Sequence, residues 1–216
     1  MLQKKALFLH GYLGGAEDMT PFFLEGYECH SVSLRNYMKN KVNIFDDFPG
    51  PYDLALGYSY GGRVLASLLE KKPDYVFKPV FASSRISAYT DKQLKERNAL
   101  QKKLILMSLN DFEYYWNTLP LFQGHSMSDY RVKYKIDHEK WNQEEISYYL
   151  KNEFTYENPV DYKKFYTKSS YFYGNSDVKY KSEAKKLPFT SKSFKGGHRF
   201  LFEQVEAIKK ELVNLK

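Results

Sequence analysis

The sequence predicts an α/β fold built on a mainly parallel sheet. Short apolar runs alternate with segments of helical spacing over the first 82 residues, and the same alternation returns near residue 166. Strands that alternate with helices are typical of βαβ units, in which the crossover helix returns the chain so that the next strand runs parallel. Hydrophobic residues make up 43% and charged residues 27% of the 216-residue chain, a composition typical of a folded domain with a sizeable core.

Each element follows from its apolar pattern. The first apolar run is continuous, which is typical of a buried parallel strand, and the second alternates. The expected strands are residues 6–9, 29–34, 52–57, 76–82, 169–173 and 189–194. Helical spacing of apolar residues predicts helices between them and after the last strand. The expected helices are residues 17–26, 61–70, 91–110, 182–186 and 201–215.

The chain changes character in its middle third. Residues 111–160 are rich in Tyr, Lys and Glu and lack the alternation of strands. We interpret residues 84–165 as a mainly helical cap, inserted into a single domain whose core is formed by residues 1–83 and 166–216.

Charge and cysteine content bound the function less tightly. The net charge of +7 is compatible with an anionic partner, but also with solubility alone. The single cysteine, Cys29, excludes an intrachain disulfide and indicates a reducing compartment. The N-terminal apolar run is too short for a secretory signal, and no segment approaches transmembrane length. We therefore expect a cytoplasmic monomer or homodimer that needs no metal or other cofactor and binds neither nucleic acid nor membrane.

A Gly-x-Ser-x-Gly motif lies between an expected strand and an expected helix. It reads Gly57-Tyr58-Ser59-Tyr60-Gly61. Such a turn lifts a serine hydroxyl above the carboxyl edge of the sheet, and small flanking residues relieve the crowding around its strained backbone. The alternative is an ordinary glycine-rich turn, which the motif alone does not exclude. We predict that Ser59 is the catalytic serine.

Two further residues complete a candidate triad. A serine hydroxyl reacts poorly until a histidine takes its proton, and the histidine needs an orienting carboxylate. His198 follows the last expected strand, and Asp177 follows the strand before it. Each alone could be an ordinary loop residue. The order Ser, Asp, His and the placement at strand ends together favour a triad.

The first strand is followed by a glycine-rich loop that can complete an oxyanion site. The loop reads His10-Gly11-Tyr12-Leu13-Gly14-Gly15. We predict that the backbone N–H groups of Tyr12 and Tyr60 stabilise a developing oxyanion. We also expect His10 and Gly11 to lie against the substrate.

These motifs resemble the α/β-hydrolase superfamily over most of the chain, from residue 7 to about residue 200. Several resemble one branch, 2-succinyl-6-hydroxy-2,4-cyclohexadiene-1-carboxylate (SHCHC) synthase of menaquinone biosynthesis. Arg63 stands four residues past the serine, as in that family's elbow. The segments 116–122 and 174–180 resemble its Trp…Pro-Leu-Phe and Gly-x-x-Asp-x-Lys-Phe motifs, and residues 95–98 occupy the place of its arginine-rich cap helix.

The resemblance implies a carbon–oxygen lyase that eliminates pyruvate from a substrate with three carboxylates. Ser59 would then act as a base, supported by Asp177 and His198. A multiply anionic substrate needs fixed cations, for which Arg63 and Arg97 are the candidates. The alternative for Arg63 is an ordinary residue on a helix surface. For Arg97 the alternative carries more weight, because the sequence does not define the register of the cap. Trp116 and Phe122 would line the pocket.

Some features depart from that branch. No residue clearly matches its further cap arginine, for which Arg131, Lys133, Lys135 and His138 are loose substitutes. A carboxylesterase or thioesterase with Ser59 as nucleophile is therefore the alternative, because the same triad serves both reactions. A non-catalytic binding protein on this fold is a third hypothesis, disfavoured by the complete triad.

Overall fold

The computed structural model describes residues 3–35, 44–122, 144–146 and 160–215. The chain divides into two compact units, one formed by residues 1–87 and 160–216, the other by residues 88–159. We refer to them as the core unit and the insert, and describe each by itself.

The core unit is built on a six-stranded sheet in the order β2-β1-β3-β4-β5-β6, and every neighbouring pair is parallel. Its strands are β1 (Lys4–Leu9), β2 (Tyr27–Val32), β3 (Tyr52–Tyr58), β4 (Val76–Ala82), β5 (Ser170–Gly174) and β6 (Thr190–Phe194). The predicted α/β fold with a mainly parallel sheet is thereby confirmed. The register aligns Leu9 with Gly57 and Ala82 with Phe172, so the loops that follow these strands leave from one edge.

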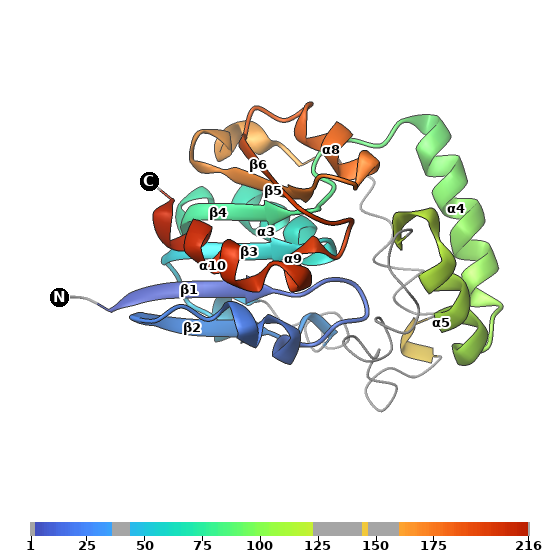
Figure 1. Ribbon diagram of the computed structural model, residues 1–216, viewed down its shortest axis with the longest axis horizontal. Coiled ribbons are helices and arrows are strands. Elements are labelled where there is room, and N and C mark those ends of the chain that lie inside the picture. The colour runs from blue at the N-terminus through green and yellow to red at the C-terminus, as the bar shows by residue number, and fades with distance from the viewer. Residues whose placement is uncertain (1–2, 36–43, 123–143, 147–159, 216) are drawn as a thin grey trace. The chain divides into compact units, whose positions relative to one another are not determined.

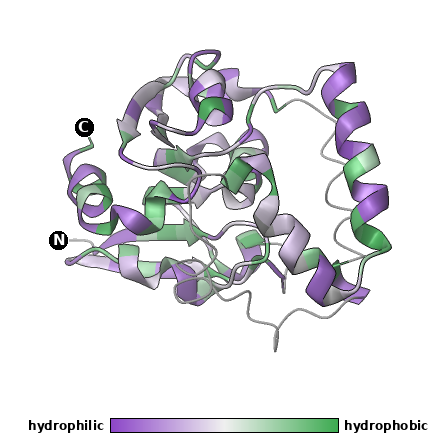
Figure 2. Cartoon of the chain, turned by 45° about the vertical axis from the view of Figure 1, so that its right-hand side comes forward, coloured by the Kyte–Doolittle hydropathy of each residue, from purple (hydrophilic) through white to green (hydrophobic). Residues whose placement is uncertain are grey.

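Helices cover both faces of this sheet. Figure 1 shows α9 (Phe200–Glu203) and α10 (Val205–Asn214) on one face and α3 (Tyr60–Lys71) on the other. The apolar core beneath α9 and α10 draws on the strands, on these helices and on the 3₁₀ helix η1 (Ala16–Phe22). Figure 2 shows hydrophobic residues concentrated along the strands. Strands buried on both faces account for the continuous apolar runs in the sequence.

Several helix boundaries differ from the sequence prediction, and the helix expected at 17–26 is the shorter 3₁₀ helix η1. The helix expected at 182–186 is α8 (Val178–Ala184), which begins four residues earlier because Asp177 caps it. The expected closing helix is interrupted at Gln204, between α9 and α10. In the insert, α4 (Asp91–Ile105) ends before residue 110, and α5 (Leu109–Thr118) starts after an N-cap at Ser108.

The remaining described elements are short. They are α2 (Ile44–Asp47), η2 (Pro73–Tyr75), η3 (Pro120–Phe122), η4 (Tyr162–Lys164) and η5 (Tyr166–Lys168). None of the helices among the described residues combines the length and apolar character that crossing a membrane requires.

Candidate active site

Ser59 occupies a strained turn between β3 and α3. Its backbone has φ +50° and ψ −109°, a conformation that residues other than glycine rarely adopt. The N–H of Ser59 donates to the carbonyl oxygen of Ala82 at 2.8 Å, which ties the turn to the end of β4. The turn sits at the carboxyl edge of the sheet, where open α/β sheets form their sites.

Close backbone packing explains the glycines around the serine. A Cβ on Gly57 would lie 2.6 Å from the Cα of Gly62, and a Cβ on Gly61 would lie 2.2 Å from the carbonyl oxygen of Leu9. Real Cβ atoms do not approach other atoms so closely. Glycine at these positions therefore lets α3 begin directly against β3 and the end of β1.

The structure brings together the three predicted triad residues. The Nε2 atom of His198 lies 3.2 Å from Oγ of Ser59, and its Nδ1 atom lies 3.0 Å from Oδ2 of Asp177. Because a carboxylate accepts, Nδ1 carries the proton and Nε2 can accept the serine hydroxyl. His198 and Asp177 are buried, so solvent water screens the charge of the carboxylate on the ring only weakly.

Asp177 is fixed by contacts beyond the histidine. It is the N-cap of α8, where Oδ1 accepts the backbone N–H of Tyr180 at 3.1 Å. The hydroxyl of Ser83, just past β4, donates to Oδ2 at 3.4 Å. The carboxylate therefore has partners on both oxygens, and its orientation toward His198 is set by the helix start.

Two tyrosine rings flank the His198 ring. The Tyr180 ring stacks on it with centroids 4.9 Å apart, and the Tyr58 ring lies 5.5 Å away. The Tyr58 hydroxyl also donates to the backbone oxygen of His198 at 3.2 Å. Sequence reasoning missed this aromatic clamp, although Tyr58 stands inside the serine motif.

Burial lowers the pKa of His198 below its ordinary 6.5, and the nearby Lys179 and Arg199 lower it further. The hydrogen bond and negative charge of Asp177 raise the pKa, but the net change is still downward. The ring is therefore neutral at pH 7, the form that can accept a proton from Ser59.

Backbone contact between two loops brings Asp177 and His198 together. A Cβ on Gly174 would lie 2.1 Å from the carbonyl oxygen of Gly197. The N–H of Ser176 also donates to the carbonyl oxygen of Gly196 at 3.0 Å. The loops after β5 and β6 can therefore approach to van der Waals distance because the last residue of β5 is a glycine, which has no Cβ.

The loop after β1 lies against the serine turn. A Cβ on Gly11 would lie 3.5 Å from the Cβ of Ser59, so the backbone of residue 11 is next to the serine side chain. Tyr12 follows it, in a turn that Gly14 closes by donating its N–H to the oxygen of Gly11 at 3.2 Å. Tyr60 is the first residue of α3, where backbone N–H groups have no partner within the helix. Both predicted oxyanion donors therefore come from segments adjoining Ser59.

The ring of His10 is hydrogen-bonded to the backbone through both nitrogens. Its Nδ1 donates to the oxygen of Gly11 at 2.7 Å, and its Nε2 accepts the N–H of Leu34 at 2.9 Å. Backbone groups thus occupy both ring nitrogens of this buried side chain, which holds the loop instead of offering a nitrogen to a substrate. Burial lowers the pKa of His10 to about 4, so the ring stays neutral.

The predicted cations and aromatic residues fall in both units. Arg63 is half-buried on α3 of the core unit, one turn beyond Ser59. Arg97 is in the insert, on α4, where Nη1 donates to the Tyr89 hydroxyl at 2.8 Å. Trp116 lies 6.1 Å from Phe122 between ring centroids, and together with Phe112 these rings form an aromatic cluster within the insert.

Some predictions concern parts outside the described residues. Arg131, Lys133, Lys135 and His138 belong to these parts. Within the described ranges, no group of three or more His, Cys, Asp or Glu side chains has the arrangement of a metal site.

A parallel sheet with helices on both faces and a strained serine turn after its third strand defines the α/β-hydrolase fold. MenH from S. aureus shares the fold with a TM-score of 0.77 and 17% identity, over 100% of this chain and 94% of that chain. A carboxylesterase of Nitrososphaera gargenis matches with a TM-score of 0.70 and 11% identity, over 98% of this chain and 89% of that chain.

Carboxylesterase CesB from Bacillus subtilis also matches, with a TM-score of 0.62 and 14% identity, over 98% of this chain and 83% of that chain. Identities this low show a common fold and leave the reaction open. No family model matches the sequence, and no curated protein matches it.

Proposed function

We propose that this chain is an enzyme whose reactive group is the Ser59 hydroxyl. The observation that carries the proposal is the hydrogen-bonded series from Ser59 Oγ to His198 Nε2 and from His198 Nδ1 to Asp177 Oδ2. A neutral histidine with one nitrogen held by a carboxylate and the other facing a strained serine can withdraw the serine proton. The positive φ of Ser59 is compatible with this role, because strained backbone conformations cluster at active sites.

For the reaction, we propose elimination of pyruvate from an anionic substrate, as in SHCHC synthase. The support lies in the sequence motifs, with Arg63 one turn past Ser59 and the segment from Gly174 to Tyr180. The fold match to MenH, an SHCHC synthase, is compatible with this choice. An arginine binds a carboxylate through two parallel hydrogen bonds, so Arg63 is suited to a substrate with several carboxylates.

In this mechanism Ser59 acts as a base. Its hydroxyl proton passes to Nε2 of His198 as Oγ takes a proton from a ring carbon of the substrate. The electron pair of that C–H bond forms a new double bond, and the C–O bond to the pyruvate unit breaks. The N–H groups of Tyr12 and Tyr60 stabilise the negative charge that develops on oxygen, and the proton on His198 returns to the leaving group.

Carboxylester hydrolysis is the second candidate, supported by the carboxylesterases among the structural matches. Here Ser59 Oγ attacks an acyl carbon, and the alcohol leaves with the proton taken up by His198. Water, deprotonated by His198, then attacks the acyl group, the acid is released, and the proton returns to Ser59 Oγ. The two candidates differ at Arg63, because a neutral ester gives its guanidinium no carboxylate to bind.

The test is a pair of assays on one set of variants. Pyruvate release from the enolpyruvyl-bearing pathway intermediate is compared with hydrolysis of short aryl esters. We expect Ser59→Ala to lower the favoured activity by about 10³-fold or more. The exposed Ser193 on β6 supplies a matched control, Ser193→Ala, which should retain full activity. Wild-type turnover by Ser59→Ala would overturn the enzymatic assignment.

Arg63→Ala separates the two reactions. Under the lyase proposal it raises KM for the anionic intermediate by about tenfold to a hundredfold, the usual worth of a charged hydrogen bond. Aryl ester hydrolysis should change much less. Equal losses in both assays would contradict the anionic substrate.

A further inference from the structure

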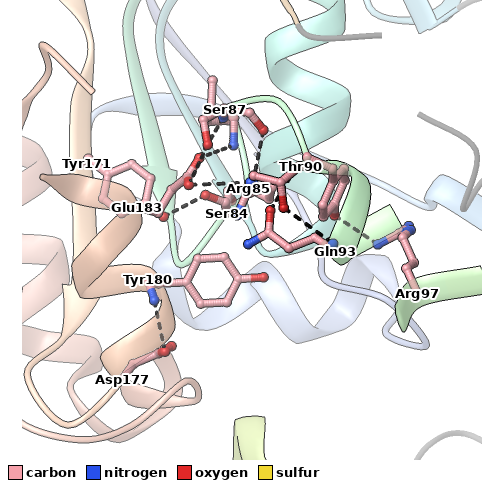
Figure 3. Close-up of polar contacts among 12 residues, drawn as sticks. Ser84, Arg85, Ser87, Thr90, Gln93, Arg97, Tyr171, Asp177, Tyr180 and Glu183 are labelled. Atoms are coloured by element: carbon pink, nitrogen blue, oxygen red, sulfur yellow. Dashed lines mark hydrogen bonds and ion pairs between the residues drawn. The ribbon is translucent and has the colours of Figure 1, made fainter. Parts of the chain in front are cut away.

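A buried carboxylate that the mechanism does not use lies on the helix that carries Asp177. Glu183 is 1% exposed and belongs to α8. Its Oε1 accepts the backbone N–H groups of Ile86 at 2.9 Å and Ser87 at 2.6 Å, and its Oε2 accepts the Ser87 hydroxyl at 2.7 Å. Figure 3 shows the Glu183 carboxylate directed at the segment that contains Ser84, Arg85 and Ser87.

The same carboxylate faces a buried arginine. Nε of Arg85 lies 3.5 Å from Oε2 of Glu183 and donates to the carbonyl oxygen of Ser87 at 2.9 Å. A buried carboxylate is costly unless hydrogen bonds and an opposite charge offset the loss of water. Glu183 has both, which fixes its side chain and the backbone of residues 86–87 as one rigid unit.

The segment from Ser83 to Ser87 is also held at its other end. The Ser83 N–H donates to the oxygen of Phe172 at 2.9 Å, and the Tyr171 hydroxyl donates to the oxygen of Ser84 at 2.6 Å. Ser83 has φ +42°, a conformation that must be held in place by its surroundings. From this position its hydroxyl reaches Oδ2 of Asp177 at 3.4 Å.

Spacing along α8 connects these contacts to the candidate active site. Asp177, Tyr180 and Glu183 follow one another at intervals of three residues, so neighbours in this series share one side of the helix. Asp177 binds His198, and the Tyr180 ring stacks on the His198 ring. Glu183 binds the segment that begins at Ser83. Asp177 is thus held through α8 and through Ser83, and Glu183 joins α8 to the segment that begins at Ser83.

We propose that Glu183 is a positioning residue for the His198–Asp177 pair. It acts through α8 and through residues 83–87, without contact with Ser59 or with substrate. The carboxylate keeps α8 and this segment at a fixed separation, and the two together aim Asp177 at Nδ1 of His198. For its kinetic readout this inference rests on the proposed function, because turnover requires the serine to be activated.

The experiment compares Glu183→Gln and Glu183→Ala with the surface control Glu206→Gln on α10. The amide oxygen of Gln can still accept the N–H groups of Ile86 and Ser87, whereas Ala leaves both without the carboxylate. We therefore expect kcat, for whichever of the two assay substrates the parent turns over, to fall about tenfold or more in the Ala variant, with KM little changed, and to be largely rescued in the Gln variant. Circular dichroism and thermal unfolding confirm that the compared proteins are folded.

A second readout does not depend on turnover. The Nδ1 proton of His198 gives a far-downfield NMR signal while it is hydrogen-bonded to Asp177. We expect this signal in the parent protein, in Glu206→Gln and in Glu183→Gln, and its broadening or upfield shift in Glu183→Ala. An unchanged signal in folded Glu183→Ala would overturn the positioning role. If the parent shows the signal but turns over no substrate, the proposed function fails while the positioning role is still decided.

Discussion

The buried His10 should make the stability of this protein sensitive to acid. The pKa of His10 is about 4 in the folded protein, because burial disfavours the charged ring, and about 6.5 in the unfolded chain. Between these values the unfolded chain binds more protons than the folded protein. The free energy of unfolding therefore falls as the pH decreases from about 6.5 to about 4.

The magnitude follows from the two pKa values. One pKa unit corresponds to about 1.4 kcal/mol, so a drop from 6.5 to about 4 corresponds to roughly 3 kcal/mol. The free energy of unfolding of a typical domain is only about 5–15 kcal/mol, so the loss caused by titration of this one ring is a sizeable fraction of it. Protonation would also place a donor at Nε2, where the N–H of Leu34 now donates, and the two would repel.

The assay is urea unfolding of the parent protein and of His10→Asn at pH 7, 6, 5 and 4. The Asn amide can still donate to the oxygen of Gly11 but cannot titrate. At pH 7 we expect the variant to be less stable by about 1–3 kcal/mol, because the Leu34 N–H loses its acceptor. By pH 4 this difference should shrink by about 3 kcal/mol or change sign.

Comparing the two proteins cancels every other titrating group, including His198, whose pKa is also lowered. A difference that stays constant within about 0.5 kcal/mol over this pH range would refute the reasoning, because it would show that His10 binds its proton equally well in both states.

Two further predictions concern the serine turn and the aromatic clamp. Gly61→Ala should destabilise the protein by about 1–3 kcal/mol although alanine favours helices, because its Cβ would lie 2.2 Å from the Leu9 oxygen; urea unfolding measures this, and a stabilised variant would contradict the packing. Tyr180→Leu should shift the acid limb of the pH–rate profile to higher pH. Removing the stacked ring lessens the burial that lowers the pKa of His198. Tyr180→Phe keeps the ring and should keep the parent profile; identical profiles in all three proteins would argue against the clamp.

The sheet was largely predictable from sequence. The strand at 76–82 has the predicted bounds, and the others lie within about two residues of them. For β1, β3 and β4 this success has a physical origin, because parallel strands covered on both faces leave apolar runs. The edge strands β2 and β6 are less buried. Helix ends were harder to place. The start of α8 carried a usable signal in Asp177, a favourable N-cap, whereas no glycine or proline marks the break at Gln204.

The candidate triad was predictable because strand ends that share one edge bring their loops together. The supporting residues were not, because their contacts depend on how distant loops pack. Glu183 has lysines nearby on both sides in the sequence and resembles an exposed helix residue, yet it is buried. Tyr180 matches a motif position, but the sequence does not reveal that its ring stacks on His198. His10 was expected to lie against the substrate, and its hydrogen bond to the N–H of Leu34 could not be predicted because Leu34 lies 24 residues away.

The strand order also governs when Ser59 can acquire its partners during folding. Ser59 and His198 are 139 residues apart, and the loop that carries His198 is placed only when β6 pairs with β5 at the edge of the sheet. Contacts of such long sequence separation form late, because the entropy of closing a long loop opposes them. During synthesis the serine turn can therefore form with β3 and α3 well before the histidine exists. Under the proposed function, the Ser59 hydroxyl of a newly made chain therefore stays unreactive until β6 has docked.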